Sequence, residues 1–260
     1  MSQPLALYRY CDLTGNGLEY FEDMMAHSRT KFSSPLHFND PFDCRVRYDL
    51  RNKRDDVVAC YAEYLIRTGT GDLEKAEREV PIAITELEKW QEDRVQNISR
   101  GLANSGMLCL TTSCDDLVMW THYAKHHSGI CVQFRLRDGS DLEQVDFFAQ
   151  ARAISYTNEA PLINWVLDER PVILQKVFFT KALPYCYEQE WRIVHYDKSP
   201  NVKPIPKGII AAVILGVNIQ PHDKERVINA CTKYDREVEI VQAVLNPVPY
   251  SLAFSQEAVV

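Results

Sequence analysis

Two glutamates separated by one residue, Glu188 and Glu190, are the residues whose types and spacing best indicate chemistry. They precede the segment Trp191–Val194, so we predict an extended chain in which side chains at i and i+2 point to the same face. Two carboxylates on one face repel each other. They therefore need a cationic partner, for which Arg192 is placed at i+2 of Glu190, or a substrate that develops positive charge. A fixed carboxylate stabilises such a charge as it grows in the transition state.

Two further segments place polar groups on predicted strands. Arg9 lies in the first predicted strand, residues 5–10, and its planar guanidinium suits a diphosphate because it donates two parallel hydrogen bonds. Thr111, Thr112 and Ser113 lie at the end of a predicted strand, residues 107–112. Such a hydroxyl triplet is also typical of a strand followed by a helix cap, and an arginine in a strand is usually a surface residue.

The order of an arginine, strand hydroxyls and Glu-x-Glu resembles the R-S-E class of ADP-ribosyltransferases. In that class the arginine contacts NAD phosphate or ribose, the hydroxyl-bearing strand shapes the nicotinamide pocket, and the second glutamate supports cleavage of the nicotinamide–ribose bond. The triplet here is Thr-Thr-Ser where the class has Ser-Thr-Ser. The resemblance implies these roles: NAD binding for Arg9 and the adjacent Tyr10, pocket walls for Thr111 and Ser113, catalysis for Glu190, and orientation or deprotonation of the acceptor for Glu188.

Four blocks, in order, resemble the bacterial domain of unknown function 2971 family. They are Leu7–Tyr10, Phe38–Asp43, Met119–Ile130 and Tyr187–Arg192. The family name assigns no activity. The resemblance implies a recurring bacterial design, found in part near mobile or defence loci.

The second block supplies two candidate binding residues, Asn39 and Asp40. The surrounding loop, residues 34–43, contains two prolines and three Asn or Asp residues, a composition typical of Asx turns. We keep two interpretations open: a structural turn, or a loop that covers part of a bound nucleotide.

The third block lies in a predicted helix over residues 116–127. Trp120 and Tyr123 share one face of that helix, which indicates either packing into the core or a pocket wall to which Tyr123 or His122 contributes. His122 and His126 have the i, i+4 spacing of a metal site. No HExxH pattern accompanies them, so we expect no metal.

The elements that must position these residues predict an α+β fold. Strands dominate the segments before residue 55 and after residue 107, and helices dominate the segment between them. We expect a single domain, residues 1–260, with a mixed, mainly antiparallel sheet like the split sheet of ADP-ribosyltransferases and an inserted helical lobe at about 55–104.

Composition limits the classes of function. The formal net charge of −7 and the pI of about 5.5 argue against a non-specific binder of polyanions. The N-terminus has no secretory signal, and the longest apolar run, residues 209–217, is too short to cross a bilayer. The eight cysteines lack CxxC and zinc-site spacing, which is typical of core thiols in a reducing compartment. We expect a cytoplasmic protein.

The prediction for function is a bacterial defence or toxin enzyme that consumes NAD. It would transfer ADP-ribose to a protein or nucleic-acid acceptor, or hydrolyse NAD, with NAD as substrate, no metal and no membrane partner. We expect Arg9, Ser113 and Glu190 to line one pocket. One alternative is a metal-dependent nuclease or phosphodiesterase with magnesium on Asp40, Asp43 and the glutamate pair, which Arg192 in place of a catalytic lysine disfavours. The other is a non-enzymatic, defence-associated binding protein.

Overall fold

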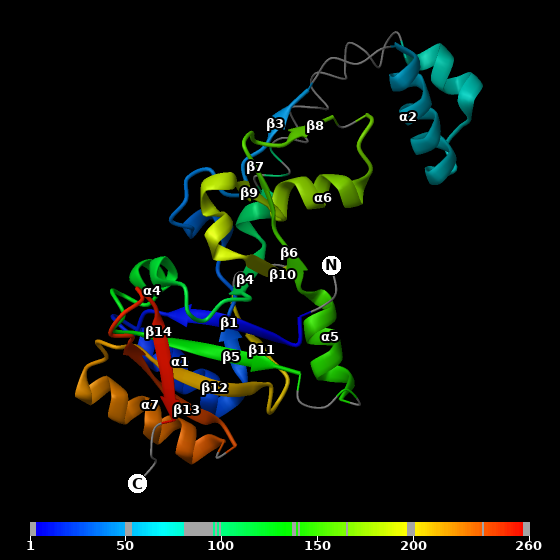
Figure 1. The fold of residues 1–260 in the computed structure, drawn as a ribbon. Coiled ribbons are helices and arrows are strands. Elements are labelled where there is room, and N and C mark those ends of the chain that lie inside the picture. The colour runs from blue at the N-terminus through cyan, green and yellow to red at the C-terminus, as the bar shows by residue number, and fades with distance from the viewer. Residues whose placement is uncertain are drawn as a thin grey trace. The chain divides into compact units, whose positions relative to one another are not determined.

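The computed structural model describes residues 4–49, 54–80, 96, 98, 100–136, 139, 141–164, 166–196, 201–235 and 237–256. The chain divides into two compact units (Figure 1). The first unit is built from Met1–Ser33, Gly106–Ile154 and Pro184–Val260, and the second from Ser34–Ser105 and Ser155–Leu183.

The first unit is organised around an eight-stranded sheet. Among the described strands of this sheet, β12 (Ile210–Leu215) and β13 (Glu239–Leu245) pair in parallel, and the other neighbours are antiparallel. The prediction of an α+β fold with a mixed, mainly antiparallel sheet is therefore confirmed. In sheet order the strands are β14 (Leu252–Gln256), β13 (Glu239–Leu245), β12 (Ile210–Leu215), β5 (Ile130–Arg135), β1 (Ala6–Cys11), β4 (Gly106–Thr111), β10 (Glu190–His195) and β6 (Arg152–Ala153).

Helices cover both faces of this sheet because successive strand residues alternate between faces. One face carries Leu7, Leu110 and Val132 and packs in one core with residues of three helices. The other face carries Tyr10 and Cys131 and packs against a single short helix. The first three helices are α1 (Gly17–His27), α5 (Leu142–Gln150) and α7 (Pro221–Tyr234), and the short one is α4 (Leu117–Tyr123), as Figure 1 labels them.

Local sequence explains why two of these helices begin and end where they do. The α1 helix places Leu18, Phe21 and Met25 on one buried face, and it ends at Ser28, whose φ of 47° is left-handed. At the start of α4, a carboxylate oxygen of Asp116 accepts the backbone N–H of Met119, as expected of an N-cap.

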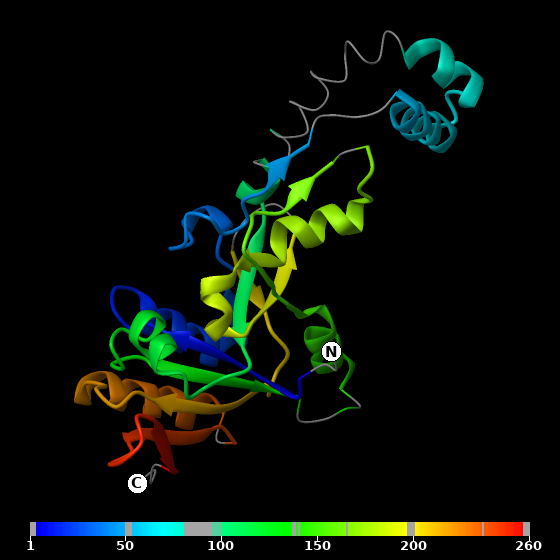
Figure 2. The ribbon, with the colours of Figure 1, turned by 45° about the horizontal axis from the view of Figure 1, so that its top comes forward.

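A small ribbon follows α1 in the first unit. Strand β2 (Arg29–Lys31) pairs antiparallel with β11 (Val202–Pro204). The 3-10 helix η2 (Leu183–Glu188) leads into β10, which runs antiparallel to β4 (Figures 1 and 2).

The second unit is built from short strands and helices. In α2 (Arg54–Thr68), Val58 and Leu65 pack with Ala76 and Val80 of the helical residues 73–80. The predicted insertion, 55–104, falls within this unit, and residues 155–183 belong to the same unit. Positions 81–95, 97 and 99 of that prediction lie outside the described residues. The other elements are η1 (Pro35–His37), β3 (Arg47–Tyr48), α2 (Arg54–Thr68), β7 (Ser155–Thr157), β8 (Leu162–Ile163), α6 (Arg170–Phe178) and β9 (Thr180–Ala182).

Within the described residues, no helix is both long enough and apolar enough to cross a membrane. No disulfide joins any of the eight cysteines, all of which lie among the described residues.

Candidate functional site

The two glutamates do not share one face of a strand, so that expectation is wrong. Glu188 is the last residue of η2, Glu190 is the first residue of β10, and Gln189 between them has a φ of 45°. A non-glycine residue in this left-handed region stores strain of about 1–3 kcal/mol. The turn sends the two carboxylates to different partners.

Glu190 forms a buried, bidentate ion pair with Arg192. The Nε and Nη2 atoms of Arg192 donate to the two carboxylate oxygens of Glu190, at 2.7 and 2.9 Å. Arg192 is 0% exposed and Glu190 is 5% exposed. Both side chains leave β10 on the same face, as their i, i+2 spacing requires. The salt bridge that the sequence offered as the alternative to catalysis is therefore present.

Glu188 is held by the helix on the same face of the sheet. The Tyr123 hydroxyl of α4 donates to Oε1 of Glu188 at 2.7 Å. Glu188 is buried, while Tyr123 is partly exposed. A hydrogen bond to a carboxylate contributes about 1.5–3 kcal/mol, so this contact fixes α4 against the turn at Gln189.

The other candidates on α4 have different surroundings. Trp120 is fully buried, its Nε1 donates to the backbone oxygen of Cys114 at 2.9 Å, and its ring meets that of Tyr10 edge-on at 5.2 Å. This is the core packing that the sequence analysis offered as one interpretation. His122 is exposed. Tyr10 is buried, and its hydroxyl has no hydrogen-bond partner among the described residues.

The predicted helix 116–127 ends earlier than expected, at Tyr123. Lys125, His126 and His127 all have positive φ, at 47°, 55° and 64°. Sequence gave no signal for this turn, because left-handed non-glycine residues normally occur singly. Two hydrogen bonds hold it: the His127 N–H donates locally to the Trp120 carbonyl, and the His127 carbonyl accepts the N–H of the distant Asn218.

Strand register places the hydroxyl-bearing residues next to the glutamate turn. Tyr8 of β1 lies opposite Thr111 of β4, which lies opposite Glu190 of β10, so these side chains share one face. Gln133 donates to the Tyr8 hydroxyl at 2.8 Å, and Thr112 donates to the Gln189 side chain at 2.9 Å. Burial raises the pKa of Tyr8. Tyr8 and Gln133 were not among the predicted site residues.

Ser113 lies two residues beyond Thr111, outside the cross-strand row of Tyr8, Thr111 and Glu190. Its backbone N–H donates to the Thr111 hydroxyl at 3.1 Å, and its own hydroxyl donates to a carboxylate oxygen of Asp115 at 2.7 Å. Both bonds are local, of the kind expected where a strand turns toward a helix cap.

Arg9 lies on the opposite face of the sheet. It is adjacent to Tyr8, and alternation along β1 directs it away from the face that carries Glu190. Its Nη1 donates to the Thr30 hydroxyl at 2.6 Å. The expectation that Arg9, Ser113 and Glu190 line one pocket is therefore wrong for Arg9. Sequence shows the alternation within a strand, but the pairing between strands decides which residues share a face.

Asn39 and Asp40 belong to the second unit. Asn39 is exposed, whereas Asp40 is buried and accepts the backbone N–H of Phe42 at 2.9 Å. This is the Asx turn that the loop composition predicted. Next to it, a carboxylate oxygen of Asp43 lies 3.6 Å from Nζ of the buried Lys181.

Among the residues described above by range, no group of three or more His, Cys, Asp or Glu is arranged to hold a metal ion.

A family model described as "Protein of unknown function (DUF2971)" matches residues 119–193. The matched segment contains most of α4, the left-handed turn after it, and the turn between Glu188 and Glu190. It supports the resemblance to that family over this part of the chain. No curated protein and no solved structure gives a match.

Proposed function

We propose that the protein consumes NAD, as an ADP-ribosyltransferase or an NAD glycohydrolase, at the face of the sheet that carries the Glu188–Glu190 turn. The observation that carries the proposal is the strained turn at Gln189, which holds one buried glutamate against Tyr123 and the other against Arg192. Strain of this kind persists only where the surrounding structure imposes it, and it concentrates at functional sites.

The residue types fit cleavage of the nicotinamide–ribose bond. As that bond breaks, positive charge grows on the sugar ring, and a carboxylate held in place stabilises it. The resemblance implies this role for Glu190, but Arg192 already neutralises Glu190 through two hydrogen bonds. We therefore assign the charge-stabilising role to Glu188 and a positioning role to Glu190.

The three motif segments also support a common site. Strands β1, β4 and β10 are adjacent in the sheet, and the row of Tyr8, Thr111 and Glu190 crosses all three. Hydroxyl groups on this row can donate to ribose or carboxamide oxygens. Arg9 has no role in this proposal, because its side chain lies on the other face.

The test is release of nicotinamide from NAD by the purified protein, followed by chromatography. We expect Glu188→Gln to lower turnover by about 100-fold or more, the usual scale for losing one group that stabilises transition-state charge. Tyr123→Phe should lower turnover less, because it removes one hydrogen bond to Glu188 and leaves the carboxylate in place. Thermal unfolding of each variant separates loss of activity from loss of fold.

Val118→Ala is the matched control, since Val118 is exposed on the same helix. It should leave turnover unchanged. If the wild-type protein neither binds nor cleaves NAD, or if Glu188→Gln turns over NAD at the wild-type rate, the proposal fails. A bacterial defence or toxin role, and a protein or nucleic-acid acceptor, are part of the same proposal and depend on that result.

A non-enzymatic binding protein is the second candidate. The fully buried bidentate pair of Glu190 and Arg192 favours it, because such a pair also fits a structural network. Under this alternative, Glu188→Gln and Tyr123→Phe would lower stability while no NAD cleavage is measured for any form of the protein.

A further inference from the structure

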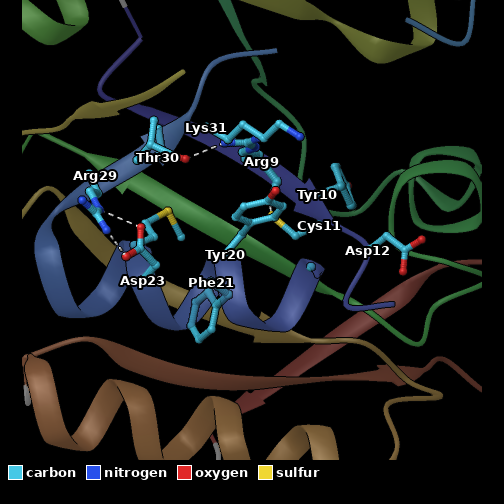
Figure 3. A pocket seen from close by; sticks show the side chains of 13 residues that line it. Arg9, Tyr10, Cys11, Asp12, Tyr20, Phe21, Asp23, Arg29, Thr30 and Lys31 are labelled. Atoms are coloured by element: carbon cyan, nitrogen blue, oxygen red, sulfur yellow. Dashed lines mark hydrogen bonds and ion pairs between the residues drawn. The ribbon is translucent and has the colours of Figure 1, made fainter. Parts of the chain in front are cut away.

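A pocket of about 170 Å³ lies where β1, α1, β2 and β11 meet in the first unit. Arg9 enters it from β1, Tyr20 from α1 and Lys31 from β2, as Figure 3 shows. It is therefore on the face of the sheet opposite to Glu190. Thirteen residues line it, and the cations among them are Arg9, Arg29 and Lys31.

Two of these cations have no acidic partner among the described residues. Arg9 makes one side-chain hydrogen bond, to the Thr30 hydroxyl, although its guanidinium has five N–H donors. The Nζ atom of Lys31 lies 5.0 Å from the centre of the Tyr20 ring. Neither side chain forms an ion pair with a described carboxylate.

The acidic residues of the pocket are already engaged. Both carboxylate oxygens of Asp23 accept hydrogen bonds from Arg29, at 2.7 and 2.5 Å. One oxygen of Asp12 accepts the backbone N–H of Thr14 at 2.8 Å. The pocket thus keeps a net positive charge in a chain whose net charge is −7.

This arrangement suits an oxyanion. A partly buried guanidinium needs hydrogen-bond acceptors, and its fork matches two oxygens of one phosphate. Lys31 adds a point charge for a dianion, and Tyr20 and Val202 provide a wall for whatever the phosphate carries. The volume is below the roughly 300–1,000 Å³ of sites for drug-sized ligands. A phosphate with a small substituent fits this limit better than a whole dinucleotide.

We propose that this pocket binds a phosphate group, as inorganic phosphate or as a small phosphate monoester, through Arg9 and Lys31. The site is separate from the one proposed for NAD, and it stands whether or not the protein cleaves NAD.

The test is calorimetric titration of the full chain with inorganic phosphate, ribose 5-phosphate and AMP, with ribose and adenosine as uncharged controls. We expect saturable binding of at least one phosphate compound, weakening as salt rises, and no binding of the controls. Tighter binding of the monoesters than of inorganic phosphate would assign the site to an organic ligand, and the reverse would assign it to the free ion.

Lys31→Met is the decisive variant because Lys31 is exposed and its loss spares the core. It should weaken binding about 10-fold, and Arg9→Gln should weaken it about 10- to 100-fold. Lys233→Met is the matched control, since Nζ of Lys233 lies 4.9 Å from the Tyr234 ring, outside the pocket. Glu188→Gln should leave phosphate binding unchanged.

The proposal is overturned if no phosphate compound binds saturably at millimolar concentration. It is equally overturned if Lys31→Met and Lys233→Met have the same effect on the dissociation constant.

Discussion

Replacing Glu190 with Gln tests the buried ion pair directly. The change keeps the side-chain shape but removes the negative charge and one of the two oxygens that accept from Arg192. Arg192 is completely buried, so water cannot take the place of that oxygen. Removing one partner of a buried ion pair typically costs about 3–5 kcal/mol, and because Gln retains one acceptor we expect about 3 kcal/mol.

Thermal unfolding is the first assay. For a folded unit of 150–250 residues, 1 kcal/mol corresponds to about 2–4 °C in Tm, so the transition of the first unit should fall by roughly 6–12 °C. Hydrogen exchange followed by mass spectrometry locates the effect, which should be concentrated in peptides from β4 and β10.

The matched control is Glu22→Gln. Glu22 also makes a bidentate pair, with Arg226, at 2.8 and 2.6 Å, but both of those side chains are 34% exposed. Exposed pairs contribute about 0–1 kcal/mol, so this variant should unfold within a few degrees of the wild type. A double variant, Glu190→Leu with Arg192→Met, should regain much of the loss, because apolar residues often replace a buried pair without cost.

Comparing the Tm changes of Glu190→Gln and Glu22→Gln tests whether burial controls the strength of an ion pair in this protein. If Glu190→Gln and Glu22→Gln lower Tm by the same small amount, burial does not control the strength of the pair, and the reasoning is refuted.

Three other predictions follow from single sites. Gly129→Ala should destabilise the protein by about 1–3 kcal/mol in urea titration, because the added methyl group would overlap the backbone oxygen of Cys11. Gly139→Ala, with open space around it, is the control, and equal urea midpoints for the two variants would contradict this. Burial raises the pKa of Cys11 and Cys131 and raises that of Cys231 to about 12, so these thiols should react slowly with a disulfide reagent at pH 8, whereas exposed Cys186 should react at once. Equal labelling rates at Cys186 and Cys231, measured by peptide mass spectrometry, would contradict this. Burial, with a smaller contribution from His126, lowers the pKa of His127 below its ordinary 6.5. The unfolded chain then binds this proton more readily, so stability should fall as the pH drops from about 6.5 through the lowered pKa, and His127→Gln should show a shallower decline than the wild type.

Sequence alone was sufficient where short-range geometry governs the result. The i, i+2 spacing of Glu190 and Arg192 puts both on one face of any strand, so their ion pair could be foreseen. The Asx turn at Asp40 likewise follows from side-chain chemistry that acts over two residues. The α+β class followed from the distribution of strand and helix patterns along the chain.

Only the tertiary structure decided which of these residues meet. Tyr123 and Glu188 are 65 positions apart and come together because α4 packs on the same face as the turn. Arg9 looked like a partner of Glu190, but the register of β1, β4 and β10 aligned Tyr8 with it and turned Arg9 to the other face. The left-handed φ of Gln189 has no local signal either. Register and strain of this kind are set by non-local packing, which a single sequence does not reveal.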